Sequence, residues 1–397
     1  MFNGEKLLEL RLLNEYSRAE LGELIGLTEQ TIWQFETNTL SEVLPSIDSF
    51  RFQLAQLFKV DWSYFAGGEI PKVVNTAQIA FRNADIASKK SMKFQEVYVN
   101  TANYFIEYLE SFLLSPEWLV YELEKEIKEK KKHSELSIEE IANIAKKRLG
   151  VLSDNSDILY KIELSGIYVL ERSITGGADA YSLWTKKNVP YIVLGKGKSA
   201  ARRNFDLAHE LGHLLLHKEV AFDELNQYEY QKKEQEANQF ASSFLLPKEI
   251  FVKKFKEMVG KRISHPDSYI QLKEQFNVSI QALEMRAWKL GYLSQSQNSY
   301  FYRILNSDKK EYKVLEPLDK EISIKRPTKI RSIMDTLFIN DVITLQSLLK
   351  SKHIRLVFLS QLFGIELSFF DKYKTLNNNF AELIRVDDYK NRYEKTE

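Results

Sequence analysis

Apolar side chains in residues 5–65 recur at the three- and four-residue spacing that is typical of short amphipathic helices. Within this region Ser17 and Glu20 have the spacing of a capping box, which satisfies free N–H groups at a helix start. Gly26 stands where a tight turn would end that helix, and Thr28 is placed to cap the next one. The pattern therefore predicts two short helices joined by a turn at Gly26.

A boundary at Gly67 and Gly68 ends this region, and residues 75–133 then favour helix. Ser137 and Glu140 form a second capping box, which predicts the start of another helix. Three runs rich in β-branched and aromatic residues follow and favour the strands of a small sheet. These runs are residues 166–174, 181–185 and 191–194. Two long helices are then expected, from about residue 199 to 217 and from about 229 to 244.

The last hundred residues are harder to interpret. Residues 301–315 favour a strand, and residues 328–373 favour helices. The order of apolar and polar residues in Leu57–Phe65 returns in Leu362–Phe370, but this echo is too short to establish a repeat. We expect a multi-domain, mainly α protein with an α+β centre that carries a small sheet. Its four segments are an all-α segment at 1–68, a helical linker region at 69–134, the α+β domain at 135–297, and a mostly helical C-terminal extension at 298–397.

The composition limits which residue types can bind a metal or act as a nucleophile. The chain has 397 residues and no cysteine, which excludes disulfides, thiolate metal ligands and a cysteine nucleophile. Any metal must therefore be held by His, Asp or Glu. We find no apolar signal core at the N-terminus and no apolar run of about 18 residues, so we expect a cytoplasmic protein without a membrane span.

The run His209–His213 carries the clearest chemical signal. Its two histidines are four residues apart, so a helix places both imidazoles on one face, where they can bind one Zn²⁺. Glu210 lies beside them and can take a proton from a water molecule that the metal activates. Such runs also occur on ordinary helix surfaces. Here the flanking residues are strongly apolar, and a buried helix would not place these groups inward without a partner.

A catalytic zinc site needs a third protein ligand and an open position. The longer motif with a third histidine is absent, because Leu216 and Glu219 occupy its two further diagnostic positions. His217 lies about 12 Å along the helix from His209, so we interpret it as a helix-end residue or a supporting histidine. The third ligand should come from the next helix, where Glu234 and Glu236 are the two candidates.

Residues 202–217 resemble the metal-binding segment of the ImmA/IrrE-type metallopeptidases, and residues 234–247 and 276–291 resemble their second and closing segments. The resemblance covers roughly residues 135–295 and implies a gluzincin-like zinc peptidase. In its Glu-x-x-Ala-Asn pattern, Glu234 binds the metal and Asn238 orients a ligand histidine. Asp206 departs from the threonine that is usual at this position. Members of this family typically cleave a partner repressor and so release genes for a stress response or for the transfer of a mobile element.

The first segment resembles an XRE (Cro/repressor-like) helix-turn-helix, on residues that include Ser17, Gly26, Thr28 and Glu36. By position, Arg18 would meet a phosphate of duplex DNA. Thr28, Gln30 and Gln34 would face the major groove, where glutamines can pair with adenine edges.

The charge of this segment argues against a strong DNA-binding domain. Residues 1–67 contain five basic and ten acidic side chains, a net charge of −5, whereas affinity for duplex comes largely from cations that neutralise phosphates. A homodimer, or basic residues directly after the segment, could supply positive charge. A protein-docking or dimerisation module is the competing interpretation.

Two hypotheses remain open at this point. In the first, the chain is a zinc endopeptidase that cleaves one or few proteins, such as a repressor or a toxin encoded nearby. In the second, it is a transcriptional regulator or antitoxin-like binding protein whose zinc site is structural or sensory. Glu210 favours the enzyme, because a purely structural metal site does not need it.

Overall fold

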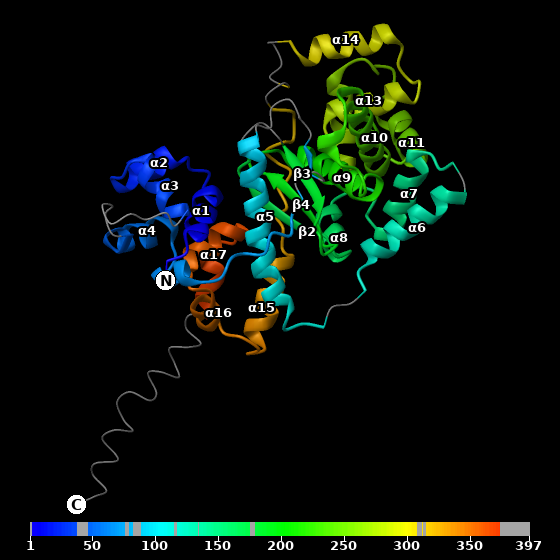
Figure 1. Ribbon diagram of the computed structural model, residues 1–397. Helices are drawn as coiled ribbons and strands as arrows, with labels where there is room; N and C mark the ends of the chain where they lie inside the picture. The colour runs from blue at the N-terminus through cyan, green and yellow to red at the C-terminus, as the bar shows by residue number, and fades with distance from the viewer. Residues whose placement is uncertain are drawn as a thin grey trace, which may run out of the picture. The chain divides into compact units, whose positions relative to one another are not determined.

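The computed structural model of the chain describes residues 2–37, 47–75, 79–81, 89–114, 117–133, 135–174, 179–307, 312 and 315–373. Within them the chain is mainly helical (Figure 1). The α-helices are α1 (Gly4–Leu13), α2 (Arg18–Ile25), α3 (Glu29–Thr37), α4 (Arg51–Phe58), α5 (Lys89–Glu110), α6 (Leu119–His133), α7 (Ile138–Leu149), α8 (Ile158–Leu164), α9 (Ala200–Leu216), α10 (Gln227–Leu245), α11 (Lys248–Met258), α12 (Ile270–Phe276), α13 (Ile280–Lys289), α14 (Gln295–Leu305), α15 (Lys329–Ile339), α16 (Leu345–Lys352) and α17 (Leu356–Phe363). The strands are β1 (Ala80–Phe81), β2 (Tyr168–Arg172), β3 (Ala180–Trp184) and β4 (Pro190–Gly195). Short 3₁₀ helices are η1 (Ile47–Phe50), η2 (Trp62–Ala66), η4 (Phe222–Glu224), η5 (Pro266–Tyr269) and η7 (Leu367–Phe370).

The chain forms two compact units. The first unit contains residues 1–72, 92–115 and 330–397, and the second contains residues 73–91 and 116–329. These units cut across the four consecutive segments expected from the sequence. The beginning and the end of the chain share the first unit, and much of the expected linker belongs to the second.

The first unit begins with the predicted pair of helices around Gly26. Ser17 caps α2 in a capping box with Glu20, as the sequence predicts. Gly26 is in the left-handed conformation, with φ 74°, which ends α2 without strain. The Thr28 hydroxyl accepts the N–H of Thr31 at 3.2 Å and so caps the start of α3. Two short helices joined by a turn at Gly26 are therefore present, as the pattern predicts.

The end of the chain completes this unit. Ile354, between α16 and α17, forms an isolated antiparallel bridge with Val60, which follows α4. The two echoing segments share one local conformation: α4 ends at Lys59 with φ 58° and leads into η2, and α17 ends at Gly364 with φ 63° and leads into η7. In both, the left-handed residue ends the helix and turns the chain into a single 3₁₀ turn.

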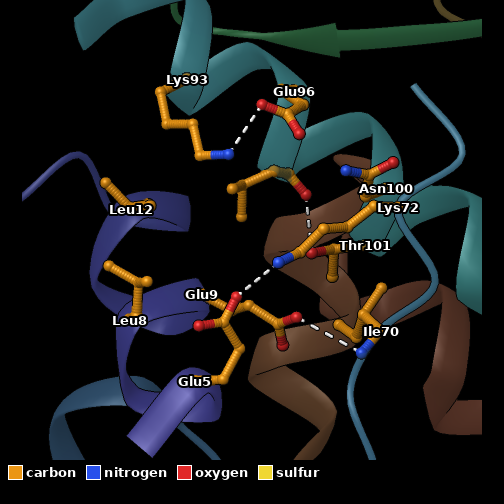
Figure 2. Close-up of a pocket in the computed structure, with 11 residues that line it drawn as sticks. Glu5, Leu8, Glu9, Leu12, Ile70, Lys72, Lys93, Glu96, Asn100 and Thr101 are labelled. Atoms are coloured by element: carbon orange, nitrogen blue, oxygen red, sulfur yellow. Dashed lines mark hydrogen bonds and ion pairs between the residues drawn. The ribbon is translucent and has the colours of Figure 1, made fainter. Parts of the chain in front are cut away.

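The interior of the first unit contains charge as well as apolar side chains. Glu9 lines a cavity of about 20 Å³, room for about one water molecule, and accepts the N–H of Ile70 at 3.3 Å (Figure 2). Lys72 pairs with Glu5 at 2.7 Å across the same cavity (Figure 2). Burial raises the pKa of the Glu9 carboxyl, and the neighbouring Lys6 ammonium opposes this shift.

The second unit is built on a small sheet with the strand order β1-β3-β4-β2. The three longer strands are those expected from the sequence. β2 runs parallel to β4, and β3 runs antiparallel to it, with Ser182 opposite Ile192. β1 was not expected, and it adds only two residues to the edge of β3. Apart from the partly exposed Arg172, the residues of β2, β3 and β4 are buried, which explains why their apolar runs do not alternate.

Helix α9 lies beside this sheet, and α10 packs against α9 (Figure 1). Apolar residues of α9, α10 and the strands share one cluster, which includes Leu207, Leu211, Phe240 and Ile192. These apolar contacts hold α9, and with it the histidines that it carries, in place between the sheet and α10.

Two secondary-structure predictions are wrong in part. Within residues 75–133, which favour helix in the sequence, Ala80 and Phe81 form β1. The strand expected at 301–315 is replaced at its start by α14, which spans Gln295–Leu305. A capping box formed by Ser294 and Gln297 begins this helix, and the side chains of Phe301 and Leu305 pack one turn apart into the core. Residues 308–311 and 313–314 of the expected strand lie outside the described residues. Among the described helices, none is both long and apolar enough to cross a bilayer.

Candidate metal centre

Two histidines on α9 face each other in the interior of the second unit. Ser199 caps this helix, and the four-residue spacing of His209 and His213 places both rings on one face. Their Nε2 atoms lie 3.0 Å apart, and the residues are 0% and 4% exposed. The prediction that these side chains share a face and point inward agrees with this arrangement.

Glu234 of α10 completes the group. Its carboxylate oxygens lie 3.2 Å from His213 Nε2 and 3.5 Å from His209 Nε2. The ligand atoms of these three residues all lie within 4.8 Å of one another. Burial alone would raise the pKa of Glu234, but the two histidines outweigh it and lower this pKa to about 2. The carboxylate is therefore ionised at neutral pH.

Gly212 allows α10 to approach this closely. A Cβ atom at Gly212 would lie 3.0 Å from the ring of Phe240, closer than ordinary van der Waals contact. The glycine lies on α9 directly before His213, and Phe240 lies on α10 between Glu234 and the end of that helix. A larger side chain here would separate the two helices and move the carboxylate away from the histidines.

Hydrogen bonds behind the histidines orient both rings. His209 Nδ1 lies 3.2 Å from the Asn238 side-chain oxygen, which can only accept, so this Nδ1 carries the proton. His213 Nδ1 lies 3.0 Å from His217 Nδ1, and His217 Nε2 lies 2.8 Å from a Glu236 oxygen. Burial lowers the pKa of His217 to about 3, so this ring is neutral and donates from Nε2 to the carboxylate. Its Nδ1 must then accept the proton of His213 Nδ1.

When both Nδ1 atoms are protonated in this way, only acceptors face the centre of the group, and a cation there takes the place of the ring protons that would otherwise be donated to Glu234. Both Nε2 atoms carry lone pairs, and the Glu234 carboxylate brings negative charge to the same point. Three converging acceptors repel one another unless a cation lies between them. The donor set of two imidazole nitrogens and one carboxylate oxygen is typical of zinc. The residues therefore fit a metal ion.

Glu210 lies next to this group without being part of it. The residue is 1% exposed and lies on α9 directly after His209 and three residues before His213. Its backbone carbonyl accepts a hydrogen bond from the Ser182 hydroxyl of β3 at 3.3 Å, which fixes this turn of α9 against the sheet. Ser182, together with His213 and His217, also lines a small depression between β3 and α9.

The structure brings together His209, His213 and Glu234, the three ligands that the sequence predicts, and adds connections that the sequence did not predict. The sequence left Glu236 as an alternative ligand, and the structure instead places Glu236 against His217. It assigned His217 a supporting place without a partner. The spacing of His217, four residues after His213, was the available signal, since such side chains meet on one helix face.

The residues expected to contact DNA lie in the first unit. Thr28 and Gln30 are exposed, and Gln34 is half-buried. Arg18, expected at a phosphate, instead donates to the buried carboxylate of Glu36 at 2.6 Å. Arg11 also pairs with Glu36, so Arg18 belongs to a charge cluster within the unit.

Comparison with known proteins agrees with the geometry of the second unit. None of the curated proteins matches the chain. The metal group, Glu210 and Asn238 all lie in the stretch that matches a known family, whereas the α2–α3 motif lies outside it. Residues 162–287 match the IrrE N-terminal-like domain of the peptidase M78 family, which supports a metallopeptidase-like unit of the ImmA/IrrE type.

Proposed function

We propose that the second unit is a zinc-dependent endopeptidase and that it cleaves a partner protein. The observation that carries this proposal is the convergence of three acceptors, His209 Nε2, His213 Nε2 and the partly buried Glu234 carboxylate, beside a second acidic residue, Glu210, that is not in the group. A structural site would use all its acidic residues as ligands or place them elsewhere. A carboxylate next to the metal group is instead suited to proton transfer.

The positions of the side chains suggest a role for each residue of the site. His209, His213 and Glu234 would hold the ion, and Asn238 and His217 would keep the two rings in the required orientation. When bound, zinc supplies a Lewis acid that polarises the scissile carbonyl and makes water more acidic. The Glu210 carboxylate accepts a proton from the attacking water and delivers it to the amide nitrogen that leaves.

The proposed substrate is a protein rather than a small molecule, and we suggest a repressor or stress regulator, or a toxin encoded nearby. This suggestion is supported by the resemblance to the ImmA/IrrE-type peptidases and by the two short helices joined at Gly26, which fit the helix-turn-helix expected from the sequence. We further propose that the first unit regulates the peptidase or brings it to its target.

Glu210→Gln tests the catalytic proposal. The amide is nearly isosteric but cannot take the proton, so cleavage of the partner should fall by several orders of magnitude. Zinc content and thermal unfolding should remain close to those of the parent, because Glu210 is not in the metal group. Partner binding should also remain, which makes this variant suitable for trapping and identifying the partner.

The competing function is a regulator or antitoxin-like protein with a structural or sensory zinc. It predicts that zinc-loaded Glu210→Gln supports full function in cells, while His213→Ala loses both metal and function. Full function of Glu210→Gln would therefore reject the peptidase.

DNA binding by the first unit is a second candidate function. The turn at Gly26 and the exposed side chains of Thr28, Gln30 and Trp33 on or before α3 favour it. If this face contacts the major groove, Gln30→Ala should relax base preference without abolishing binding, and affinity should fall steeply with salt. A gel-shift titration with the chain's own promoter region at low salt tests this, and an absence of any complex would favour a docking module.

A further inference from the structure

A cavity of about 210 Å³ lies in the second unit, on a different face of α9 from the candidate metal centre. Residues of α8, of the first half of α9 and of the segment 316–329 contribute to its walls. None of the three candidate metal ligands lines it. Leu207, which does line it, lies two residues before His209 and so about 200° around the helix from it. The cavity and the metal group therefore use separate faces of one helix.

Part of the lining is apolar. Leu159, Leu207 and Ile322 contribute to it, and the first two also belong to the core of the unit. An apolar cavity of about 150 Å³ binds benzene, so this cavity has room for an apolar body of that size. Sites for small ligands usually combine such a lining with a few polar groups that fix the orientation of the ligand.

The charged part of the lining is cationic. Arg203 is 4% exposed, and its Nη2 donates to Glu171 at 3.2 Å and to the carbonyl of Lys325 at 3.3 Å. Within the described part of the chain, its Nε and Nη1 donate to no other group. Lys325 also lines the cavity, and its ammonium forms no ion pair with a described residue. Among the described residues that line the cavity, none is Asp or Glu.

The carboxylates near Arg203 are shared with other cations. Glu171 pairs with Arg203 and also with Arg326, at 2.8 Å. Asp206 pairs with Arg202 at 3.5 Å. Positive charge therefore remains at Arg203, and burying it there is favourable only when an anion is close. A carboxylate suits this partly apolar site better than a phosphate, which needs donors for three oxygens and carries more charge.

We infer that this cavity is the binding site of a small organic anion, namely one carboxylate on an apolar body about the size of a benzene ring. Arg203 and Lys325 bind the carboxylate, and Leu159, Leu207 and Ile322 pack against the body. The ligand contacts both α9 and the segment 316–329, so its binding holds this segment to the helix. The inference is independent of the proposed peptidase, because the site binds its ligand whether or not the protein cleaves another.

Benzoate is the probe for this site, and two related compounds are its matched controls. Benzamide has the same body without the charge, and acetate has the charge without the body. In isothermal titration of the full chain we expect benzoate to bind with a Kd below about 1 mM, at least about tenfold tighter than benzamide or acetate. Benzoate should also slow the hydrogen exchange of residues 322–325. No saturable benzoate binding up to about 10 mM, or equal affinity for benzamide, would overturn the inference.

Variants of the segment 316–329 test where benzoate binds. Ser323→Phe adds a ring at a residue that lines the cavity, and it should weaken benzoate binding at least about tenfold. Lys325→Gln removes one cation and should weaken it about tenfold. Lys320→Gln is the matched control, because Lys320 is exposed on the same segment but does not line the cavity. Thermal unfolding confirms that each variant is folded, and equal binding by Lys325→Gln and Lys320→Gln would contradict the inference.

A carboxylate can also bind zinc, so the titration is repeated with His213→Ala, which removes a candidate metal ligand. Benzoate should bind this variant as tightly as it binds the parent. Loss of binding in His213→Ala, with binding retained in Lys325→Gln, would place the anion at the metal centre and overturn the inference.

Discussion

The Nδ1 atoms of His213 and His217 lie 3.0 Å apart, and this contact links a candidate metal ligand to Glu236 on a second helix. A neutral His217 that donates to Glu236 can only accept from His213. The proton of His213 is therefore held on Nδ1, and its Nε2 lone pair is kept for the metal. The four-residue spacing of these two histidines thus also determines which ring nitrogen of His213 carries the proton.

We predict that His217→Phe lowers zinc affinity by about 10- to 100-fold, because His213 loses the acceptor that fixes its proton. Competition with a chromophoric chelator measures the affinity. Lys233→Gln is the control, because Lys233 pairs with the same Glu236 carboxylate at 3.1 Å but does not contact a histidine of α9. Equal losses in the two variants would show that the effect comes from the local charge and not from the position of the proton.

Glu234 and Glu236 should differ sharply in their effect on metal binding. Glu234→Gln removes one of the three converging acceptors, and we expect it to lose most of its zinc under conditions in which the parent holds about one equivalent. Glu236→Gln should keep most of its zinc, since Glu236 acts only through His217. Elemental analysis of the purified proteins distinguishes them. The reverse order of zinc contents would make Glu236 the ligand.

A buried carboxyl outside the metal centre should make the stability of the second unit depend on pH. Burial raises the pKa of Glu284 to about 7, although two hydrogen bonds from Asn298 oppose the shift. A raised folded-state pKa means that its contribution is complete below the unfolded value of 4.5 and is lost as the pH rises through about 7. Glu284→Gln mimics the protonated form.

We therefore expect Glu284→Gln to raise the melting temperature of the second unit by roughly 3 °C or more at pH 8, with a much smaller difference at pH 5. Calorimetry at the two pH values measures this. Asn298→Ala is the control that removes the hydrogen bonds and leaves the carboxyl able to ionise. An equal rise in melting temperature at both pH values would show that Glu284→Gln acts through packing and not through ionisation.

A second prediction on stability concerns Lys273, which is 0% exposed. Its ammonium lies 2.7 Å from Glu316 and 2.6 Å from Asp319, on the segment that follows the family-matched stretch. Lys273→Met leaves two carboxylates with little solvent and no cation, and should destabilise the second unit by about 3–5 kcal/mol. Denaturant unfolding gives the value. Lys273→Met combined with Glu316→Gln and Asp319→Asn should recover much of the loss, and no recovery would show that packing of the Lys273 stem dominates.

The sequence was most informative where local interactions decide the structure. The caps at Ser17 and Ser137 and the turn at Gly26 depend on neighbours three to five residues away, and all three are present. The strands were visible because buried strands need continuous apolar runs. The histidines of α9 were paired correctly because a helix fixes the distance between positions four residues apart.

What the sequence did not predict depends on contacts between distant segments. The strand expected at 301–315 is a helix at its start, because the buried positions of Phe301 and Leu305 match a helical face once the core is formed. β1 has two residues, too few to produce a pattern. The partner of Glu236 became clear only when α9 and α10 were brought together, because helical spacing alone does not show which carboxylate meets His217.

The bridge between Val60 and Ile354 has a consequence for the order of events during synthesis. The ribosome releases the helices of the first unit early, but the residues that complete this unit emerge only after residue 329. The whole second unit is made in between and can fold first. The nascent N-terminal helices therefore keep apolar surface exposed until then, and a chain that stops early would carry a complete second unit and an incomplete first unit. Chaperone dependence and the quality control of truncated products are then expected to act on the N-terminal helices.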